Sequence, residues 1–465
     1  MRCAGGAIPR SPGPLGARTG GRGPMRILYH HRTAAEDGQA VHIRSMLRAF
    51  RATGQEVEEV ALVRRGDGTG SSDNTDSPDS PDNTDRPGAT EGSAAAERPA
   101  APQRESRWSL WEHLPRFLRE LAEYGYSASA RRMLRARGRE WRPDFIYERY
   151  AFGNAGGLQA ARALGVPLVL EVNSPMVHEL GRTRGLSFPG LARRMEGYIF
   201  ENADLICAVS EVLAGMLVEL GADPERIIVT PNGVDLADFD GAERGAARAA
   251  LGLEQLAAAD DTAGDGAHDG AHDTAGPGAG KGATDDGPIL GFVGYLRDWH
   301  RLDLVVEALA RPTLGRARLV VIGEGPAVPA LQTQARELGV ADRLHLAGPR
   351  PHGEIPSLLA AFDIGLVPAI NPYASPLKLH EYMAASLAII APDQANLREV
   401  LTPEQDALLV PPGDGPALAA ALERLAQEPD LMRGLGAAAR RTVEARELTW
   451  EGNARRVCAA VEEIL

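Results

Sequence analysis

Short apolar segments alternate with glycine-containing turns and helix patterns through most of this sequence. The first unit runs from the strand pattern after Met25, through Gly38 and a helix pattern that closes near Gly54, to a second strand. This order is typical of a parallel sheet covered by helices. A second series of the same kind begins at Ile289. Because a chain of 465 residues is too long for one core, we predict an α/β fold with two doubly wound, Rossmann-like domains.

Three segments have a composition that cannot bury an apolar core. Residues 1–24 are rich in Gly, Pro and Arg, residues 66–105 in Ser, Asp, Pro and Thr, and residues 255–287 in Gly, Ala and Asp. We predict that all three are disordered, and that Met25 is a candidate start of the chain. The repeated Gly-Ala-His-Asp of the third segment is interpreted as a spacer rather than a loose metal site, because ordering it would cost entropy.

These segments separate an N-terminal domain, residues 25–235, from a C-terminal domain, residues 288–445. The remaining residues, 446–465, contain one more helix pattern, which runs from Trp450 to Ile464. We expect this last helix to leave the C-terminal domain and to pack back on the N-terminal domain.

Charge and cysteine content restrict the function classes. The net charge of −13 argues against a general affinity for nucleic acid. The three cysteines (Cys3, Cys207 and Cys458) are too far apart for a disulfide framework or a zinc site, and they suit a reducing compartment. The sequence has no run of about 18 apolar residues that could span a membrane, and residues 1–24 lack the apolar run of a signal peptide. We therefore expect a cytoplasmic protein.

The segment Asn371–Met383 has the pattern of a loop that turns into a helix. Ser375 is suited to the N-cap, and Pro376 to the first helical position. The free N–H groups and the dipole of such a helix start attract phosphate, and Lys378 adds a full charge there. Glu381, on the same face one turn deeper, could accept hydrogen bonds from two ribose hydroxyls. A capped surface helix with an ordinary Lys–Glu pair is the alternative, and this segment alone does not decide between them.

Polar side chains follow two successive strand patterns at the point where each strand ends. Arg149 ends the first of these strands, and Glu171 and Asn173 end the second. Because ligands bind at the carboxyl ends of parallel strands, the pair of strand ends indicates the edge of a cleft, although each could be a loop cap by itself.

An arginine-rich helix pattern covers residues 131–139, and Trp108 and Trp111 precede it. Such a helix could lie on anionic lipid, which would give the protein peripheral contact with the inner membrane. The alternative, which we favour, is an amphipathic helix that covers the sheet and has a solvated basic face.

Four motifs follow one another along the chain: Pro-Asn-Gly-Val-Asp at 231–235, Phe-Val-Gly at 292–294, Gly-Glu-Gly-Pro at 323–326 and Ser-Pro-Leu-Lys-Leu-His-Glu-Tyr-Met-Ala at 375–384. In this order they resemble the GT-B glycosyltransferases of the retaining family 4 type, the glycosyl transferases group 1. The resemblance implies two Rossmann-like domains that face each other across a cleft. It also implies a nucleotide-diphosphate sugar on the C-terminal domain, and a glycan or lipid-linked hydroxyl acceptor on the N-terminal domain.

The resemblance assigns roles to individual residues. Glu381 would bind the ribose diol, and Lys378 with the amides of the helix start would hold the diphosphate. Further donor contacts are implied for Gly38, Gly294, Arg301, Gly323, Gly325, Arg350, Ser375 and Leu379. The negative charge that grows on the leaving phosphate would be balanced by Lys378, by Arg297 or Arg301, and by His300. These groups would support transfer without a metal or other cofactor. The acceptor hydroxyl would be oriented by His42, Arg149, Glu171 and Asn173.

Two positions depart from the pattern of the family. Tyr373 stands eight residues before Glu381, where a second glutamate is frequent, and Arg301 stands where glycine is usual. We expect a retaining glycosyltransferase of polysaccharide or lipid-linked glycan synthesis. The departures motivate one alternative, a non-catalytic nucleotide-sugar binder, and the fold itself allows another, a sugar-nucleotide epimerase or phosphorylase.

Overall fold

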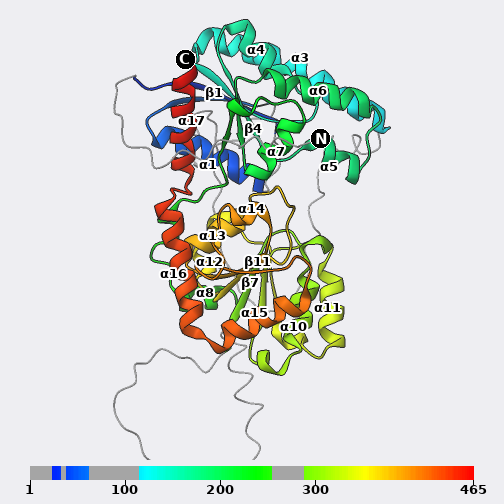
Figure 1. Cartoon of the computed structure of the whole chain (residues 1–465), viewed down its shortest axis with the longest axis vertical. Coiled ribbons are helices and arrows are strands. Elements are labelled where there is room, and N and C mark those ends of the chain that lie inside the picture. Colours follow the sequence, from blue (N-terminus) through cyan, green and yellow to red (C-terminus); the bar gives the residue numbers. More distant parts are fainter. Residues whose placement is uncertain (1–22, 33–37, 62–114, 254–286) are drawn as a thin grey trace, which may run out of the picture.

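The computed structural model describes residues 23–32, 38–61, 115–253 and 287–465 (Figure 1). The segments predicted to be disordered (1–24, 66–105 and 255–287) lie outside these ranges, apart from residues 23, 24 and 287. The described residues form two parallel, six-stranded sheets with helices packed against them. The predicted α/β fold with two doubly wound domains is therefore confirmed.

The N-terminal sheet has the strand order β2-β1-β3-β4-β5-β6. Its strands are β1 (Arg26–His31), β2 (Glu56–Ala61), β3 (Phe145–Arg149), β4 (Leu168–Val172), β5 (Leu205–Ala208) and β6 (Ile227–Val229). Its helices are α1 (Gly38–Ala52), α3 (Arg116–Trp141), α4 (Gly156–Leu164), α5 (Met176–Thr183), α6 (Pro189–Asn202) and α7 (Glu211–Glu219). Alternate side chains of β1 face opposite sides of the sheet. Tyr29 accordingly packs in the cluster that contains Phe50 of α1, and Leu28 in the cluster that contains Leu134 of α3.

The C-terminal sheet has the order β12-β11-β10-β7-β8-β9. Its strands are β7 (Ile289–Val293), β8 (Arg318–Ile322), β9 (Leu344–Gly348), β10 (Ile364–Leu366), β11 (Ala388–Pro392) and β12 (Leu408–Val410). The helices after the N-terminal sheet are α8 (Arg244–Ala250), α10 (Leu302–Leu309), α11 (Val328–Glu337), α12 (Ile355–Leu359), α13 (Leu377–Ala384), α14 (Ala395–Arg398), α15 (Gly415–Gln427), α16 (Pro429–Ala445) and α17 (Trp450–Ile464). Short 3-10 turns are η1 (Pro224–Arg226), η2 (Leu236–Phe239), η3 (Asp298–His300), η4 (Pro312–Leu314), η5 (Ala341–Arg343) and η6 (His352–Glu354).

The last helix, α17, returns to the N-terminal domain (Figure 1). Its residues Trp450 and Val457 are buried in the same cluster as Phe50 of α1. The two stretches of chain that pass between the domains run side by side, since the N–H of Val234 donates to the carbonyl of Leu448 at 3.3 Å. Among the described residues, no helix combines the length and the apolar character that a membrane span requires.

Hydrogen bonds join the two domains at the end of the sheets where the site lies. The carboxylate of Glu399, at the end of α14, accepts from the N–H groups of Glu211 (2.8 Å) and Val212 (3.1 Å) in the first turn of α7. The hydroxyl of Ser210 donates to the carbonyl of Tyr373 at 2.8 Å. The free donors of an N-terminal-domain helix are therefore satisfied by an acid of the C-terminal domain.

We predict that Glu399→Ala lowers the free energy of unfolding by about 1–3 kcal/mol, because two N–H groups lose a charged acceptor. Urea unfolding followed by tryptophan fluorescence measures this loss. The matched control is Glu337→Ala at the exposed end of α11, for which we expect a change within about 0.5 kcal/mol. Equal effects of the two substitutions would contradict the role of Glu399 in joining the domains.

Candidate active site

Helix α13 begins one residue later than the sequence predicts. Pro376 has an extended backbone and occupies the N-cap, and no side chain caps the helix. The prediction of Ser375 as the N-cap is therefore wrong. Instead, the hydroxyl of Ser375 accepts from the N–H of Asn232 at 3.0 Å, and its carbonyl accepts from the side-chain amide of Asn232. The N–H of Leu379 donates to the carbonyl of Pro376 at 3.1 Å, so this amide is not free to bind a phosphate.

Lys378 lies on the first turn of α13, and no acidic side chain among the described residues contacts it. Its Nζ stands 3.8 Å from the ring centroid of Phe292, at the end of β7. No hydrogen bond or ion pair to Lys378 forms within the described ranges. Burial lowers the pKa of Lys378 to about 7, and the charge of Glu381 opposes this effect.

Glu381 lies on the same helix, one turn further from its start, and is 7% exposed. One carboxylate oxygen is 3.6 Å from Nε2 of His352 in η6. Burial raises the pKa of Glu381 to about 7, and the charge of Lys378 opposes this effect. The two groups therefore form a cation and an acid on one helix face, each held in surroundings that disfavour its charge.

Three glycines shape the loops that face Lys378. Gly294, Gly323 and Gly325 have φ angles of 139°, 147° and 152°, values that residues other than glycine rarely adopt. A Cβ on Gly294 would stand 3.2 Å from Nζ of Lys378, and a Cβ on Gly323 would stand 2.0 Å from the carbonyl oxygen of Gly294. The loops after β7 and β8 therefore lie in contact, with the lysine amine directly beside them.

His300 is buried beneath the loop after β7. Its Nδ1 accepts from the N–H of Arg297 at 3.2 Å, which places the proton of the neutral ring on Nε2. Burial, together with the charges of Lys378 and Arg297, lowers the pKa of His300 to about 3. The ring is therefore neutral at pH 7. The guanidinium of Arg297 itself lies over the ring of Tyr295, 5.0 Å from its centroid.

The structure does not bring Arg301 and Arg350 into this cluster. The guanidinium of Arg301 is held by Asp303, with Nε 3.0 Å from one carboxylate oxygen. The exposed side chain of Arg350 donates to the carbonyl of Ala250 at 3.2 Å. Both guanidinium groups therefore contact other groups of the protein.

A second cluster lies at the strand ends of the N-terminal domain and is centred on Glu171, which is 2% exposed. The carboxylate accepts from Nε2 of His42 at 3.1 Å, from Tyr147 at 3.0 Å, and from Asn173 and Arg149. Burial favours the neutral acid, but the charges of His42 and Arg149 outweigh it and hold the pKa of Glu171 well below its usual value. Because four protein side chains already bond to its carboxylate, Glu171 fixes the positions of these side chains.

The other ring nitrogen of His42 links this cluster to α13. Nδ1 lies 2.8 Å from Oδ1 of Asn232, whose amide nitrogen is bonded to the carbonyl of Ser375. Both ring nitrogens of His42 therefore face oxygen atoms. The carboxylate of Glu171 is thus shared by His42 and Arg149.

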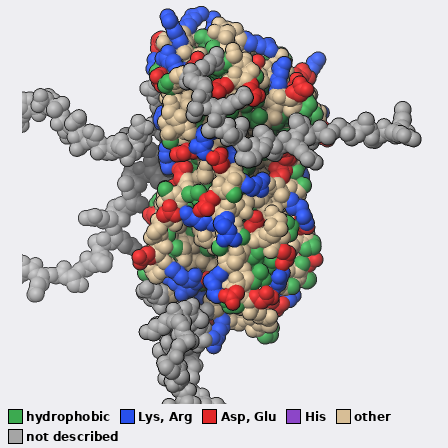
Figure 2. Space-filling view, turned by 60° about the vertical axis from the view of Figure 1, so that its left-hand side comes forward, with side chains coloured by type: hydrophobic (Ala, Val, Ile, Leu, Met, Phe, Trp, Pro, Cys, Tyr) green, Lys and Arg blue, Asp and Glu red, His purple; other side chains and the backbone are tan. Residues whose placement is uncertain are grey.

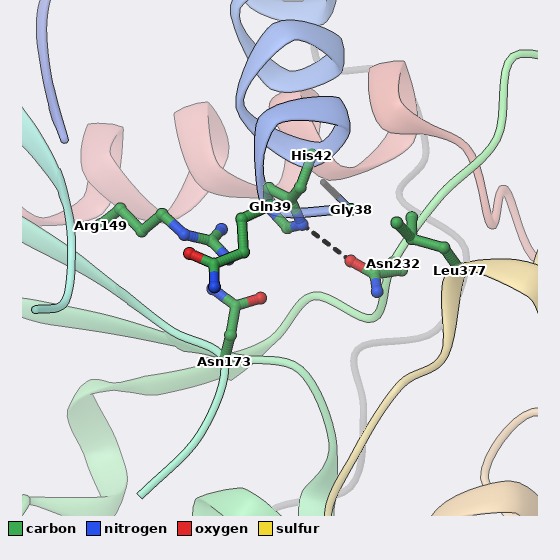
Figure 3. Close-up of a pocket in the computed structure, with 7 residues that line it drawn as sticks. All are labelled: Gly38, Gln39, His42, Arg149, Asn173, Asn232 and Leu377. Atoms are coloured by element: carbon green, nitrogen blue, oxygen red, sulfur yellow. Dashed lines mark hydrogen bonds between the residues drawn. The ribbon is translucent and has the colours of Figure 1, made fainter. Parts of the chain in front are cut away.

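A cavity of about 300 Å³ opens beside the cluster around Glu171, and Leu377 at the start of α13 forms part of its wall (Figure 3). Its lining residues are Gly38, Gln39, His42, Arg149, Asn173, Asn232 and Leu377. Gly38 begins α1 here, and a Cβ on it would stand 3.4 Å from Cδ1 of Leu377, next to Lys378. The structure therefore brings together all four residues that the sequence analysis predicts at an acceptor, and it places Gly38 against the start of α13.

Three residues of this region are not found by reasoning from the sequence. The sequence pattern assigns Asn232 only to a turn and Phe292 only to a strand, and it gives His352 no role. The Asn-Gly pair at 232–233 signals a turn, but no local pattern predicts a partner such as Ser375, which lies 143 positions away.

Tyr373 has a defined place near this region. Its hydroxyl donates to Glu179 of α5, and its carbonyl accepts from Ser210. The residue that stands in place of a second acid therefore fastens the loop before α13 to the N-terminal domain.

We predict that Gly323→Ala lowers the free energy of unfolding by about 2 kcal/mol or more, because the backbone strain adds to the clash with the carbonyl of Gly294. Gly339→Ala is the control, since Gly339 also has a positive φ (67°) but nothing within 4 Å of its Cβ position. That control should cost only about 1–2 kcal/mol. Urea unfolding of both variants measures the difference, and a smaller loss at Gly323 would contradict the tight contact of the two loops.

Comparison with known families follows the division into domains. Residues 287–428 match the family model described as "Glycosyl transferases group 1", and residues 37–233 match the model described as "Glycosyl transferase 4-like domain". Two similar curated proteins are D-inositol 3-phosphate glycosyltransferases. The protein of Thermobispora bispora is 28% identical, over 70% of this chain and 71% of its own. The protein of Actinosynnema mirum is 27% identical, over 68% of this chain and 72% of its own.

Solved structures share the fold at low sequence identity. HepE of Anabaena, in complex with UDP, aligns with a TM-score of 0.62 and 14% identity, over 94% of this chain and 100% of its own. Sucrose-phosphate synthase of Thermosynechococcus elongatus aligns with a TM-score of 0.63 and 20% identity, over 95% and 99%. From these matches and its two doubly wound domains, the chain belongs to the GT-B glycosyltransferases of the family 4 type, the glycosyl transferases group 1.

Proposed function

We propose that this glycosyltransferase moves a sugar from a nucleotide-diphosphate sugar to a hydroxyl acceptor with retention of the anomeric configuration. The observation that carries the proposal is the pair Lys378 and Glu381 on one face of α13. Lys378 has no anionic partner in contact among the residues that the structure describes, and it lies beside Gly294. The pair supplies a cation for a diphosphate and an acid for a ribose at the spacing of one helical turn.

The donor would complete the interactions of both groups. A diphosphate would give the ammonium of Lys378 an anionic partner, and two ribose hydroxyls would donate to the carboxylate of Glu381. Support for this ligand class comes from HepE of Anabaena, which was solved in complex with UDP. We place the nucleotide between the loops after β7 and β8 and the first turns of α13.

The leaving group would be stabilised without a metal ion. As the bond between the anomeric carbon and the phosphate oxygen breaks, negative charge grows on the terminal phosphate. Lys378 and Arg297 would supply positive charge there, and Nε2–H of the neutral His300 would supply a hydrogen bond. Preorganised donors of this kind contribute most when the charge develops next to them.

The acceptor would enter the cavity between the domains. Its hydroxyl oxygen would attack the anomeric carbon on the face from which the phosphate departs, and its proton would pass to the leaving phosphate oxygen. Arg149 and His42, held by Glu171, together with Asn173, would orient the acceptor. A lining with Arg149, His42 and side-chain amides suits a polar acceptor, and two curated relatives are named D-inositol 3-phosphate glycosyltransferase. We propose a glycan or lipid-linked acceptor, used in the cytoplasm for polysaccharide or lipid-linked glycan synthesis.

We predict that Lys378→Ala and Glu381→Ala each lower kcat/KM on the order of 100-fold or more, because each removes a charged contact to the donor. The measurement is transfer from a panel of nucleotide-diphosphate sugars to an acceptor extract, in buffer with EDTA. NMR coupling constants of the product then give the anomeric configuration. Arg433→Ala, an exposed change on α16, is the control and should leave the rate unchanged.

Unchanged turnover in both variants would reject the roles of Lys378 and Glu381. Inversion at the anomeric carbon would reject the retaining mechanism, and loss of activity in EDTA would reject independence from metals. Conversion of the nucleotide sugar without any acceptor would identify an epimerase, and tight binding without transfer would identify a binder.

The affinity for a nucleoside diphosphate should be highest near pH 7, because the pKa values of Lys378 and Glu381 are both about 7. Below this pH the raised pKa of Glu381 lets the acid gain a proton, and it loses its ability to accept two ribose hydroxyls. Above this pH the lowered pKa of Lys378 lets the amine lose its charge. Calorimetric titration with UDP on both sides of neutrality measures the profile.

In Lys378→Arg the guanidinium stays charged, so the alkaline loss of affinity should disappear if the ligand still fits. In Glu381→Gln the loss of affinity below pH 7 should disappear, because the amide does not gain a proton there. A wild-type profile that is flat through neutrality would contradict the proposed protonation states.

A further inference from the structure

Helix α3 presents large apolar side chains to solvent at its N-terminal end. Phe117, Leu118 and Leu121 are 46%, 41% and 47% exposed, although the opposite face of the same helix is buried at Ala130 and Leu134. Helical periodicity places the three side chains on the outer face, away from the sheet. The helix lies at the outer edge of the N-terminal domain, far from the C-terminal domain (Figure 1).

Two more exposed apolar side chains come from the start of α6. Phe188 is 36% exposed and Leu191 is 43% exposed. The carboxylate of Glu120 accepts from the N–H groups of Ser187 at 2.6 Å and Phe188 at 3.0 Å, which fixes this segment against the first turns of α3. Phe117, Leu118, Leu121, Phe188 and Leu191 are called the apolar patch below.

Basic side chains continue the outer face of α3 beyond the apolar patch. Arg132, Arg135 and Arg139 follow Leu121 at spacings of 11, 3 and 4 residues, which returns them to its side of the helix. They form no ion pair with any described residue. Seven arginines and three glutamates give α3 a net charge of +4 in a chain whose net charge is −13. Lys and Arg side chains also gather along the upper edge of the N-terminal domain in Figure 2, where α3 and α4 lie.

We propose that this face of α3 and α6 docks on an anionic lipid bilayer. The apolar patch would enter the boundary between headgroups and acyl chains, and Arg132, Arg135 and Arg139 would contact lipid phosphates. From Phe117 to Arg139 the helix spans about 33 Å, so both kinds of contact form along one axis that lies flat on the membrane. The positive charge of α3 favours an anionic bilayer as the partner, because the chain as a whole carries a negative net charge.

Docking of α3 and α6 on a bilayer is separate from sugar transfer and does not depend on it. The test is co-sedimentation of the full chain with vesicles of phosphatidylglycerol and phosphatidylcholine, compared with vesicles of phosphatidylcholine alone. We expect binding to the anionic vesicles only, and weaker binding as salt is added. Phe117→Asp with Leu121→Asp should lower the partition coefficient about tenfold or more. Changing Arg132, Arg135 and Arg139 to Gln should lower it on the order of 100-fold.

Matched controls carry the same chemical changes elsewhere on the surface. Val218→Asp with Leu338→Asp replaces two side chains of similar exposure (39% and 40%), and changing Arg336, Arg433 and Arg441 to Gln removes three exposed charges. Both controls should bind vesicles like the wild type, and thermal unfolding verifies that every variant is folded. Equal binding by the α3 variants and their controls would overturn the proposal. So would a dimer that the aspartate variants dissociate without any change in vesicle binding, since the apolar patch would then be a contact between two copies.

Discussion

The side chain of Asn232 holds the two halves of the candidate site in register. Its carbonyl oxygen faces His42 of the N-terminal domain, and its amide nitrogen is bonded to the carbonyl of Ser375, directly before the helix of Lys378. The backbone N–H of the same residue donates to the hydroxyl of Ser375. Because His42 and Asn232 belong to the same domain, the two hydrogen bonds from Asn232 to Ser375 are the ones that cross to the C-terminal domain, and a shift of one domain against the other would break both.

The cluster around Glu171 explains how buried charges are tolerated on the N-terminal side. A lone buried carboxylate would be expensive, but this one is shared by His42 and Arg149 and is hydrogen-bonded by Tyr147 and Asn173. His42 and Arg149 both line the cavity. The polar strand ends that indicated a cleft edge therefore form one group, in which the acid fixes the positions of His42 and Arg149.

Periodicity and turn chemistry explain why much of the fold and part of the site could be predicted. The three-residue spacing of Lys378 and Glu381 places both on one helix face in any helix, and a glycine directly after a strand pattern, such as Gly323, indicates a positive φ angle. Long-range pairing is different. No local signal shows that Ser375 bonds to Asn232 and leaves the N-cap to Pro376. Arg301 could not be placed either, since its ion pair with a neighbouring aspartate competes with a phosphate for the same guanidinium.

The cluster of Lys378 and Glu381 is organised differently from the cluster around Glu171, and under the proposed function this difference has a consequence. Lys378 and Glu381 are each held where burial opposes their charge, and neither finds a full set of partners within the described protein. This arrangement costs stability, because charged groups lose hydration without compensating contacts. A nucleoside diphosphate would supply an anion to one group and hydroxyl donors to the other, so the cost would be relieved only when the donor is bound. In the proposed function, the unfavourable burial of these two groups would therefore favour a ligand that carries both an anion and two neighbouring hydroxyls.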